Sequence, residues 1–141
     1  MDRPDVSRQK VEAVRDLMNA HVPNCLVEGY EELISSLTLP DPNDRHVLAA
    51  AIECEADTIV TFNLKDFPAA ILEPYGIVAR HPDDFVARRI ASSPLVVCGA
   101  AKQQRESLKN PPMSVDEFLT SLERQGLVQT VASLRLFAEH L

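Results

Sequence analysis

The sequence contains no tryptophan, and its two tyrosines and five phenylalanines make up only 5% of the residues. A hydrophobic core must therefore be built mainly from Leu, Val, Ile and Ala side chains. The three cysteines, Cys25, Cys54 and Cys98, form no CxxC pair, which argues against disulfides and cysteine-based zinc sites and favours a reducing, cytoplasmic location. No apolar run approaches the roughly 18 residues of a membrane span, and the charged N-terminal segment lacks the apolar stretch of a signal peptide.

Length and charge describe an acidic protein of single-domain size. The chain has 141 residues and a formal net charge of −7. All of this excess lies in residues 1–101, because 9 Lys and Arg face 16 Asp and Glu there, whereas residues 102–141 hold five of each. Such a balance argues against a purely electrostatic nucleic-acid binder, but it is compatible with a site where a cation neutralises carboxylates.

Apolar patterns in the first two thirds of the chain predict an α/β fold with a parallel sheet. Helical spacing predicts helices, and β-branched runs predict buried strands. The expected helices lie at 6–20, with Ser7 as N-cap, at 43–55, and at 84–91, where residues 81–83 form the cap. Short helical turns are expected at 32–37 and after Phe67. The expected strands lie at 57–62 and 77–79, with a further candidate at 25–27. The expected strands are few for a parallel sheet, and the first expected helix has no strand before it. We therefore expect a fold that is incomplete at its N-terminus.

From Ser93 onward the pattern is wholly helical. Helices are expected at 95–109, at 115–124 with Ser114 as N-cap and Gly126 at the end, and at 128–141. We therefore predict two parts, an α/β domain over 1–92 and a helical C-terminal extension over 93–141.

The densest polar signal comes from two segments, LPDPNDRHVLAAAI at 39–52 and DTIVTFNLKDFP at 57–68. Asp41 and Asp44 lie at the start of the expected helix, and Asn63 and Asp66 follow the expected strand. Open α/β sheets bind ligands at the carboxyl ends of their strands. Carboxylate and amide oxygens suit Mg²⁺ or Mn²⁺, which can activate water and orient a phosphodiester.

Each of these residues also has a purely structural interpretation. Asp41, followed by Pro42 and then Asp44, matches a helix cap with proline at the first position and an acid in the first turn. Capping explains Asp41 and does not require Asp44. Asn63 and Asp66 are common turn residues.

The pattern DRHVLAAAI…ADTIVTFNLKDF resembles the second half of a PIN domain over roughly residues 1–90, and most resembles the VapC-like toxin nucleases of bacterial toxin–antitoxin pairs. The helical C-terminal segment resembles an extension found in one branch of that family. The resemblance implies a three-layer α/β/α fold and Mg²⁺- or Mn²⁺-dependent cleavage of single-stranded RNA by a cluster of three or four acids.

Carried over residue by residue, the resemblance places Asp44 on the family's acid at the start of the helix before the strand. Asn63 stands where many members have a further acid, and Asp66 is the candidate that substitutes for it. Two other family acids lie upstream, at the end of a first strand and on an early helix, and this sequence begins after both. Asp2 and Asp5 lie in a polar leader and are not assigned as ligands. The resemblance therefore implies a truncated or degenerate PIN domain.

These observations give catalytic candidates Asp44, Asp66 and Asn63, and metal ligands Asp44, Asp66 and Asp41. The candidates for binding RNA phosphate are Lys65, Arg45 and His46, for which surface ion pairing is the alternative interpretation.

The favoured function is a metal-dependent endoribonuclease, the toxin of a toxin–antitoxin pair. The alternative is a non-catalytic module that binds an antitoxin-like partner or self-associates through residues 94–141. A phosphotransfer-type domain is a weaker third candidate, because Asn63 rather than an acid follows the strand.

Overall fold

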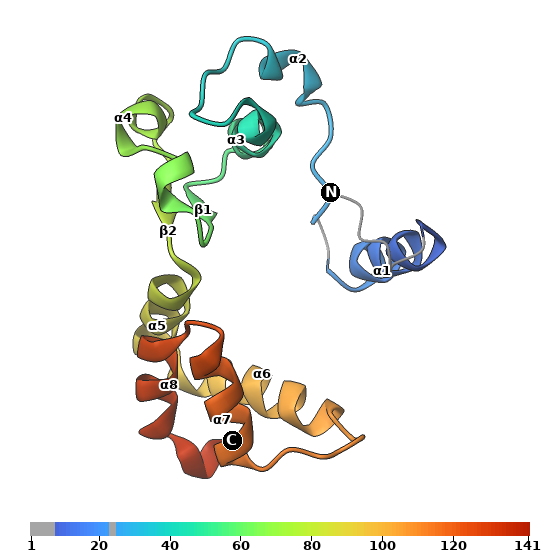
Figure 1. Cartoon of the computed structure of the whole chain (residues 1–141), viewed down its shortest axis with the longest axis vertical. Coiled ribbons are helices and arrows are strands. Elements are labelled where there is room, and N and C mark those ends of the chain that lie inside the picture. The colour runs from blue at the N-terminus through green and yellow to red at the C-terminus, as the bar shows by residue number, and fades with distance from the viewer. Residues whose placement is uncertain (1–7, 23–24) are drawn as a thin grey trace. The chain divides into compact units, whose positions relative to one another are not determined.

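The computed structural model describes residues 8–22 and 25–141, so the predicted cap at Ser7 lies outside the described residues. The structure is mostly helical with a small parallel sheet, as expected for an α/β protein (Figure 1). It divides into two compact units, Met1–Asp57 and Thr58–Leu141. In the described part of the chain, no helix combines the length and apolar character needed to cross a membrane.

The first unit contains helices α1 (Arg8–His21), α2 (Glu31–Ile34) and α3 (Arg45–Glu53), with a 3₁₀ turn, η1 (Pro42–Asp44), leading into α3. α2 packs against α3, and α3 buries Leu48, Ala49 and Ala51 on one face. The predicted strand at 25–27 is wrong: these residues are irregular, and Leu26 is 58% exposed. No strand among the described residues pairs with this short run, so its apolar character alone does not make it a strand.

The second unit begins with the sheet. Strands β1 (Thr58–Val60) and β2 (Val78–Arg80) are parallel, with Thr58 opposite Val78 and Val60 opposite Arg80 (Figure 1). The crossover consists of η2 (Leu64–Asp66), α4 (Ala69–Leu72) and η3 (Glu73–Tyr75). It ends at Gly76, whose φ of +69° is the left-handed conformation that glycine tolerates. The predicted parallel pairing is confirmed, although β1 is shorter than expected and β2 is shifted by one residue.

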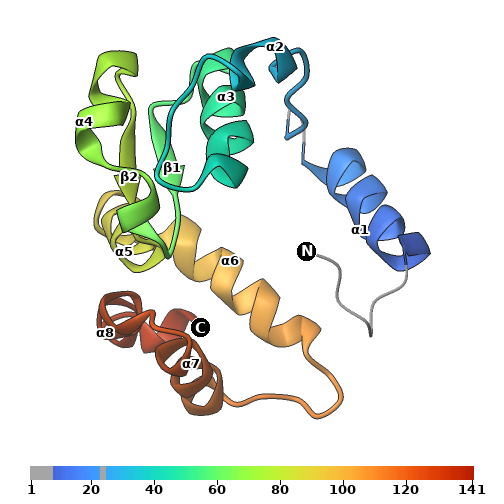
Figure 2. The same cartoon turned by 45° about the horizontal axis from the view of Figure 1, so that its top comes forward.

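Four helices follow, which lie together in both whole-chain views (Figures 1 and 2). They are α5 (Pro82–Ser92), α6 (Pro94–Ser107), α7 (Val115–Arg124) and α8 (Val128–Arg135). α5 packs against both α6 and α8, and α7 packs against α8. Their shared core buries side chains from all four helices and the chain end, namely Ile90, Cys98, Phe118, Leu119, Val131, Leu134 and Leu141.

The last predicted helix is shorter than expected. α8 ends at Arg135, and a 3₁₀ turn, η4 (Ala138–His140), follows. The hydrogen bonds change to the tighter i→i+3 pattern, for example from the Phe137 N–H to the Leu134 carbonyl at 2.9 Å, which is common at helix ends. Leu141 is buried in the core, and its main-chain oxygen accepts from Arg105 Nε and Nη2 at 2.9 and 2.8 Å.

Ser114 caps α7 as the sequence predicts, and the structure shows that it does so in a capping box with Glu117. The Glu117 N–H donates to Ser114 Oγ at 3.2 Å, and the Ser114 N–H donates to Glu117 Oε1 at 3.1 Å. We expect Ser114→Ala to lower the free energy of unfolding by about 1 kcal/mol, because it leaves a helix N–H without its partner. Chemical denaturation measures this, and Ser114→Asn, which also caps helices, should restore stability. Equal stability of all three proteins would contradict the role of the cap.

Candidate functional site

Asp41 acts as a cap. It lies in an extended conformation before η1, and its Oδ1 accepts from the Asn43 N–H at 2.9 Å. Pro42 fills the first position of the turn, where a missing N–H has no cost. The structural interpretation of Asp41 is therefore confirmed, and its role as a metal ligand stays a prediction.

Asp44 occupies the next position with a different role. It precedes α3, yet its side chain makes no capping hydrogen bond. Asp44 is partly buried, and its carboxylate has neither a hydrogen bond nor an ion pair to another residue within the described ranges. Beside it, Arg45 Nε donates to the Pro42 carbonyl at 3.0 Å, and the His46 side chain is exposed. Asp44 thus presents uncommitted oxygens.

The polar residues after β1 form a defined loop. Asn63 precedes η2, and its N–H donates to Thr61 Oγ1 at 3.0 Å, while its side chain caps nothing. Asp66 ends η2 and is partly buried, whereas Lys65 is exposed. As the sequence predicts, these residues follow the carboxyl end of a strand.

The predicted donors come from both compact units, with Asp41 and Asp44 in the first and Asn63 and Asp66 in the second. Within residues 8–22 and 25–141, no group of three or more His, Cys, Asp and Glu side chains is placed to hold a metal ion. The donor chemistry itself suits a hard cation, because carboxylate and amide oxygens are its preferred protein ligands. Assembly of these donors around Mg²⁺ or Mn²⁺ stays a prediction.

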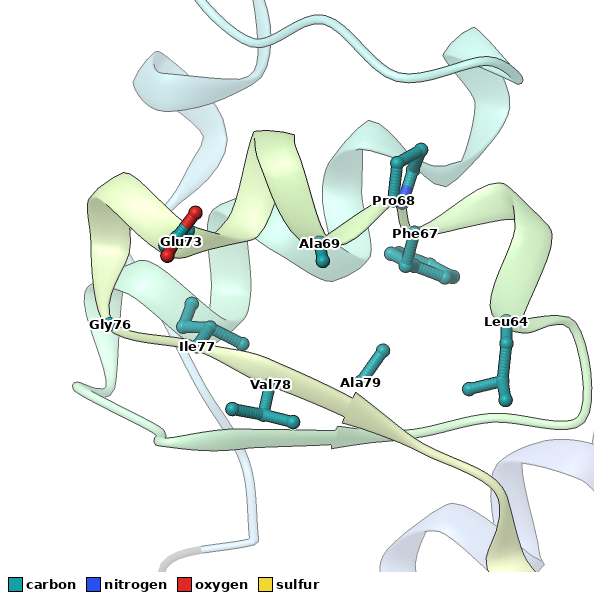
Figure 3. A pocket seen from close by; sticks show the side chains of 9 residues that line it. All are labelled: Leu64, Phe67, Pro68, Ala69, Glu73, Gly76, Ile77, Val78 and Ala79. Carbon is teal, nitrogen blue, oxygen red and sulfur yellow. The ribbon is translucent and has the colours of Figure 1, made fainter.

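A pocket of about 530 Å³ lies in the second unit between α4 and β2 (Figure 3). Figure 3 shows the side chains of Ile77 and Ala79 directed toward α4, as alternation along a strand requires. The lining is mostly apolar, from Leu64, Phe67, Pro68, Ala69, Glu73, Gly76, Ile77, Val78 and Ala79. None of the predicted site residues lines this pocket, so it is distinct from the predicted acidic site.

Asp83 has a structural role that the sequence patterns did not reveal. Its side chain is buried, and its two carboxylate oxygens accept from the Gln129 and Thr130 N–H groups at 2.9 and 2.7 Å. Burial raises the pKa of the Asp83 carboxyl, but the hydrogen bonds from Thr130 and Gln129 outweigh this and hold the pKa below its usual value. Asp83 on α5 therefore caps α8. One feature of the sequence indicates that α8 needs a cap from elsewhere: the residue at its N-cap position is the apolar Leu127, whose side chain cannot accept a hydrogen bond.

An aromatic contact lies beyond the carboxyl ends of both strands. The Phe62 and His81 rings meet edge to face, with centroids 5.1 Å apart and planes at 87°. Phe62 is nevertheless 59% exposed. The sequence predicted Phe62 as the end of a buried strand, so its exposure is a correction, and it arises because β1 ends at Val60.

Two basic side chains come from β2 and α5, the two elements that His81 connects. Arg80 Nη1 and Arg88 Nε donate to the same Asp84 oxygen at 3.3 and 3.0 Å. The hydrogen bond from Arg88, with a second from Arg80, holds the pKa of the Asp84 carboxyl below its usual value. Two guanidinium groups share one carboxylate, so this cluster carries an excess positive charge.

The C-terminal helices are similar to a known protein family. Residues 82–136, which include α5 to α8, match the family model of the VapC50 C-terminal domain. No solved structure matches the chain.

A second similarity also includes residues on the N-terminal side of α5. The chain is 36% identical over 113 residues to the "Putative ribonuclease VapC50" of Mycobacterium tuberculosis, an alignment that includes 77% of this chain. Both comparisons support a VapC-like PIN-domain protein, as the sequence pattern indicates. It spans 64% of the length of that relative.

Proposed function

We propose that this protein is a metal-dependent endoribonuclease that cleaves single-stranded RNA and acts as the toxin of a toxin–antitoxin pair. The observation that carries the proposal is the 36% identity over 113 residues to a protein named as a VapC-type ribonuclease. A three-layer α/β/α arrangement around the parallel sheet and a cytoplasmic location, where RNA is accessible, are part of the same proposal.

Asp44 is the principal metal ligand in this proposal, with Asp66 and Asn63 as further ligands and Asp41 in a supporting role. The side chains of Asp44, Asp66 and Asn63 support this role because none of them is used as a helix cap, whereas Asp41 is a cap. Mg²⁺ or Mn²⁺ bound by such oxygens supplies activation of water and orientation of the phosphodiester.

The basic and polar residues beside these acids bind the substrate in this proposal. Lys65 is exposed in the loop after β1. Arg45 uses its Nε for the Pro42 carbonyl, and its guanidinium carries four further N–H donors. Arg45, Lys65 and the exposed His46 are the groups that we expect to contact RNA phosphates.

Cleavage of a labelled single-stranded RNA by the full chain tests the proposal. We expect Mn²⁺ or Mg²⁺ to support cleavage, and EDTA to abolish it. The same RNA annealed to its complement should be resistant. Cleavage that persists in EDTA would contradict the metal requirement, and the absence of cleavage with either cation would contradict nuclease activity in this chain.

The second candidate is a non-catalytic module that binds an antitoxin-like protein or forms a homodimer through the C-terminal helices. Two observations favour it: the described residues contain no three-acid cluster, and Val96 and Leu136 are apolar side chains that are 74% and 81% exposed. A chain that fails to cleave RNA but has the mass of a dimer by light scattering would support this candidate over the nuclease.

A further inference from the structure

Phe62 is held in place although its ring is mostly exposed. On one side, the Thr61 N–H donates to the Arg80 carbonyl at 2.9 Å, which extends the strand pairing beyond β1. On the other side, the Asn63 N–H donates to Thr61 Oγ1 at 3.0 Å and fixes the start of the loop. The backbone around Phe62 is therefore ordered on both sides, and its 59% exposure is a feature of the folded unit.

His81 is held equally firmly beside it. The imidazole Nδ1 accepts from the Asp83 N–H at 3.1 Å, which makes His81 the N-cap of α5. Its ring then meets Phe62 edge to face at 5.1 Å between centroids. An exposed aromatic ring buttressed by a second ring presents a preorganised flat surface of the kind that binds unstacked bases.

Basic residues close to His81 in the chain match the same ligand. Arg80 immediately precedes His81, and through Asp84 it is connected to Arg88, whose side chain is 63% exposed. Guanidinium groups bind phosphate oxygens with directed hydrogen bonds, whereas apolar protein partners would gain little from them. An aromatic surface beside cations is the combination that single-stranded nucleic acids require.

We propose that Phe62, supported by the His81 ring, is a stacking platform for an unpaired base of single-stranded RNA, with Arg80 and Arg88 contacting the adjacent phosphate. This inference rests on the proposed function and extends it, because it assigns a base-binding position at the carboxyl edge of the sheet. The Asn63–Asp66 loop, which holds predicted catalytic residues, directly follows Phe62 in the sequence. The proposed platform therefore adjoins these residues along the chain.

The test measures binding of a fluorescein-labelled single-stranded RNA of about 12 nucleotides to the full chain by anisotropy. Ca²⁺, which takes the same oxygen ligands, replaces Mg²⁺ and Mn²⁺, and a gel verifies that the RNA stays intact. Phe62→Leu keeps an apolar side chain but removes the ring, and we expect it to weaken binding by about 5- to 100-fold, the effect of losing one stacked base. Phe62→Trp, which offers a larger ring, should bind at least as tightly as the wild type.

Tyr75 provides a matched control. It is a comparably exposed aromatic residue, 47% exposed, in η3 before β2 and away from the carboxyl edge of the sheet. Tyr75→Leu should leave RNA binding unchanged. RNA made with abasic residues should bind the wild type weakly, and Phe62→Leu should lose little further affinity for it.

The outcomes separate this inference from the proposed function. Wild-type affinity in Phe62→Leu, together with RNA cleavage by the wild type, would overturn the platform and leave the nuclease intact. A wild type that neither binds nor cleaves RNA would overturn both. Should Phe62→Leu be unfolded by circular dichroism, the comparison of Phe62→Trp with the wild type decides, and weaker binding by a folded Trp variant would contradict stacking.

Discussion

Replacement of Asp83 by alanine is expected to lower the free energy of unfolding by about 2–4 kcal/mol, a large effect for a single polar side chain. The carboxylate accepts from the Gln129 and Thr130 N–H groups, which lie in the first turn of α8 and have no partner within the helix. Removal of Asp83 leaves both donors without a charged acceptor at a buried position. Denaturant titration followed by circular dichroism measures the loss.

A neighbouring acid serves as the control for Asp83. Asp84 is in the same turn of α5, but it pairs with Arg80 and Arg88 at the surface, where ion pairs contribute little. Asp84→Ala should therefore be much less destabilising than Asp83→Ala. If the two variants were equally stable, the hydrogen bonds that the N–H groups of α8 donate to Asp83 would not contribute to the stability of the C-terminal helices.

The lowered pKa of Asp83 predicts how its contribution depends on pH. Hydrogen bonds from Thr130 and Gln129 favour the ionised form, so the pKa in the folded state lies below the unfolded value of about 3.9. The stabilisation is therefore complete above that unfolded pKa and is lost as the pH falls through the folded pKa. The stability difference between the wild type and Asp83→Asn should be constant from pH 7 to about 5 and decrease below pH 4.

Local signals predicted the helices of the C-terminal part well. α6 and α7 lie close to their expected ranges because proline at the start of α6 and the capping box of α7 act within a few residues. The parallel pairing of β1 and β2 was predictable for a similar reason, since β-branched residues and a connecting helix indicate a crossover.

Features that depend on distant contacts could not be predicted in this way. Asp83 reads as a helix-start residue of α5, and nothing nearby indicates that it caps a helix 46 residues further along the chain. The short apolar run at 25–27 resembles a strand, but a strand also needs a partner. Phe62 continues a β-branched run, and the end of pairing after β1 is what leaves its ring exposed.

The candidate acidic site could be predicted in part from the sequence. In the sequence, capping explains Asp41 and does not require Asp44. The structure agrees, because the Asp41 side chain caps η1 and the Asp44 side chain makes no capping hydrogen bond. Whether Asp44, Asp66 and Asn63 share one cation depends on the assembly of donors from two compact units, which local patterns do not determine.

Replacement of Asp44 by asparagine is expected to reduce metal-dependent RNA cleavage by at least about 100-fold while leaving the protein folded. An amide is neutral and a weaker ligand for Mg²⁺ or Mn²⁺ than a carboxylate, and even residues that only support metal ligands contribute 10- to 100-fold. The fold should tolerate the change because the Asp44 side chain makes no capping hydrogen bond. Isothermal titration calorimetry with Mn²⁺ should show that cation binding is weakened in parallel with the loss of activity.

Asp116→Asn is the matched control, because Asp116 also lies at the start of a helix and its side chain is 91% exposed. Both substitutions remove one negative charge from a helix N-terminus, which changes stability by about 0.3–1 kcal/mol. We therefore expect similar small losses of stability in the two variants, and loss of cleavage in Asp44→Asn alone. Full metal affinity in Asp44→Asn would show that another residue is the principal ligand. Unfolding of Asp44→Asn would show instead that this acid has a structural role, and either result would reject its assignment as the centre of the metal site.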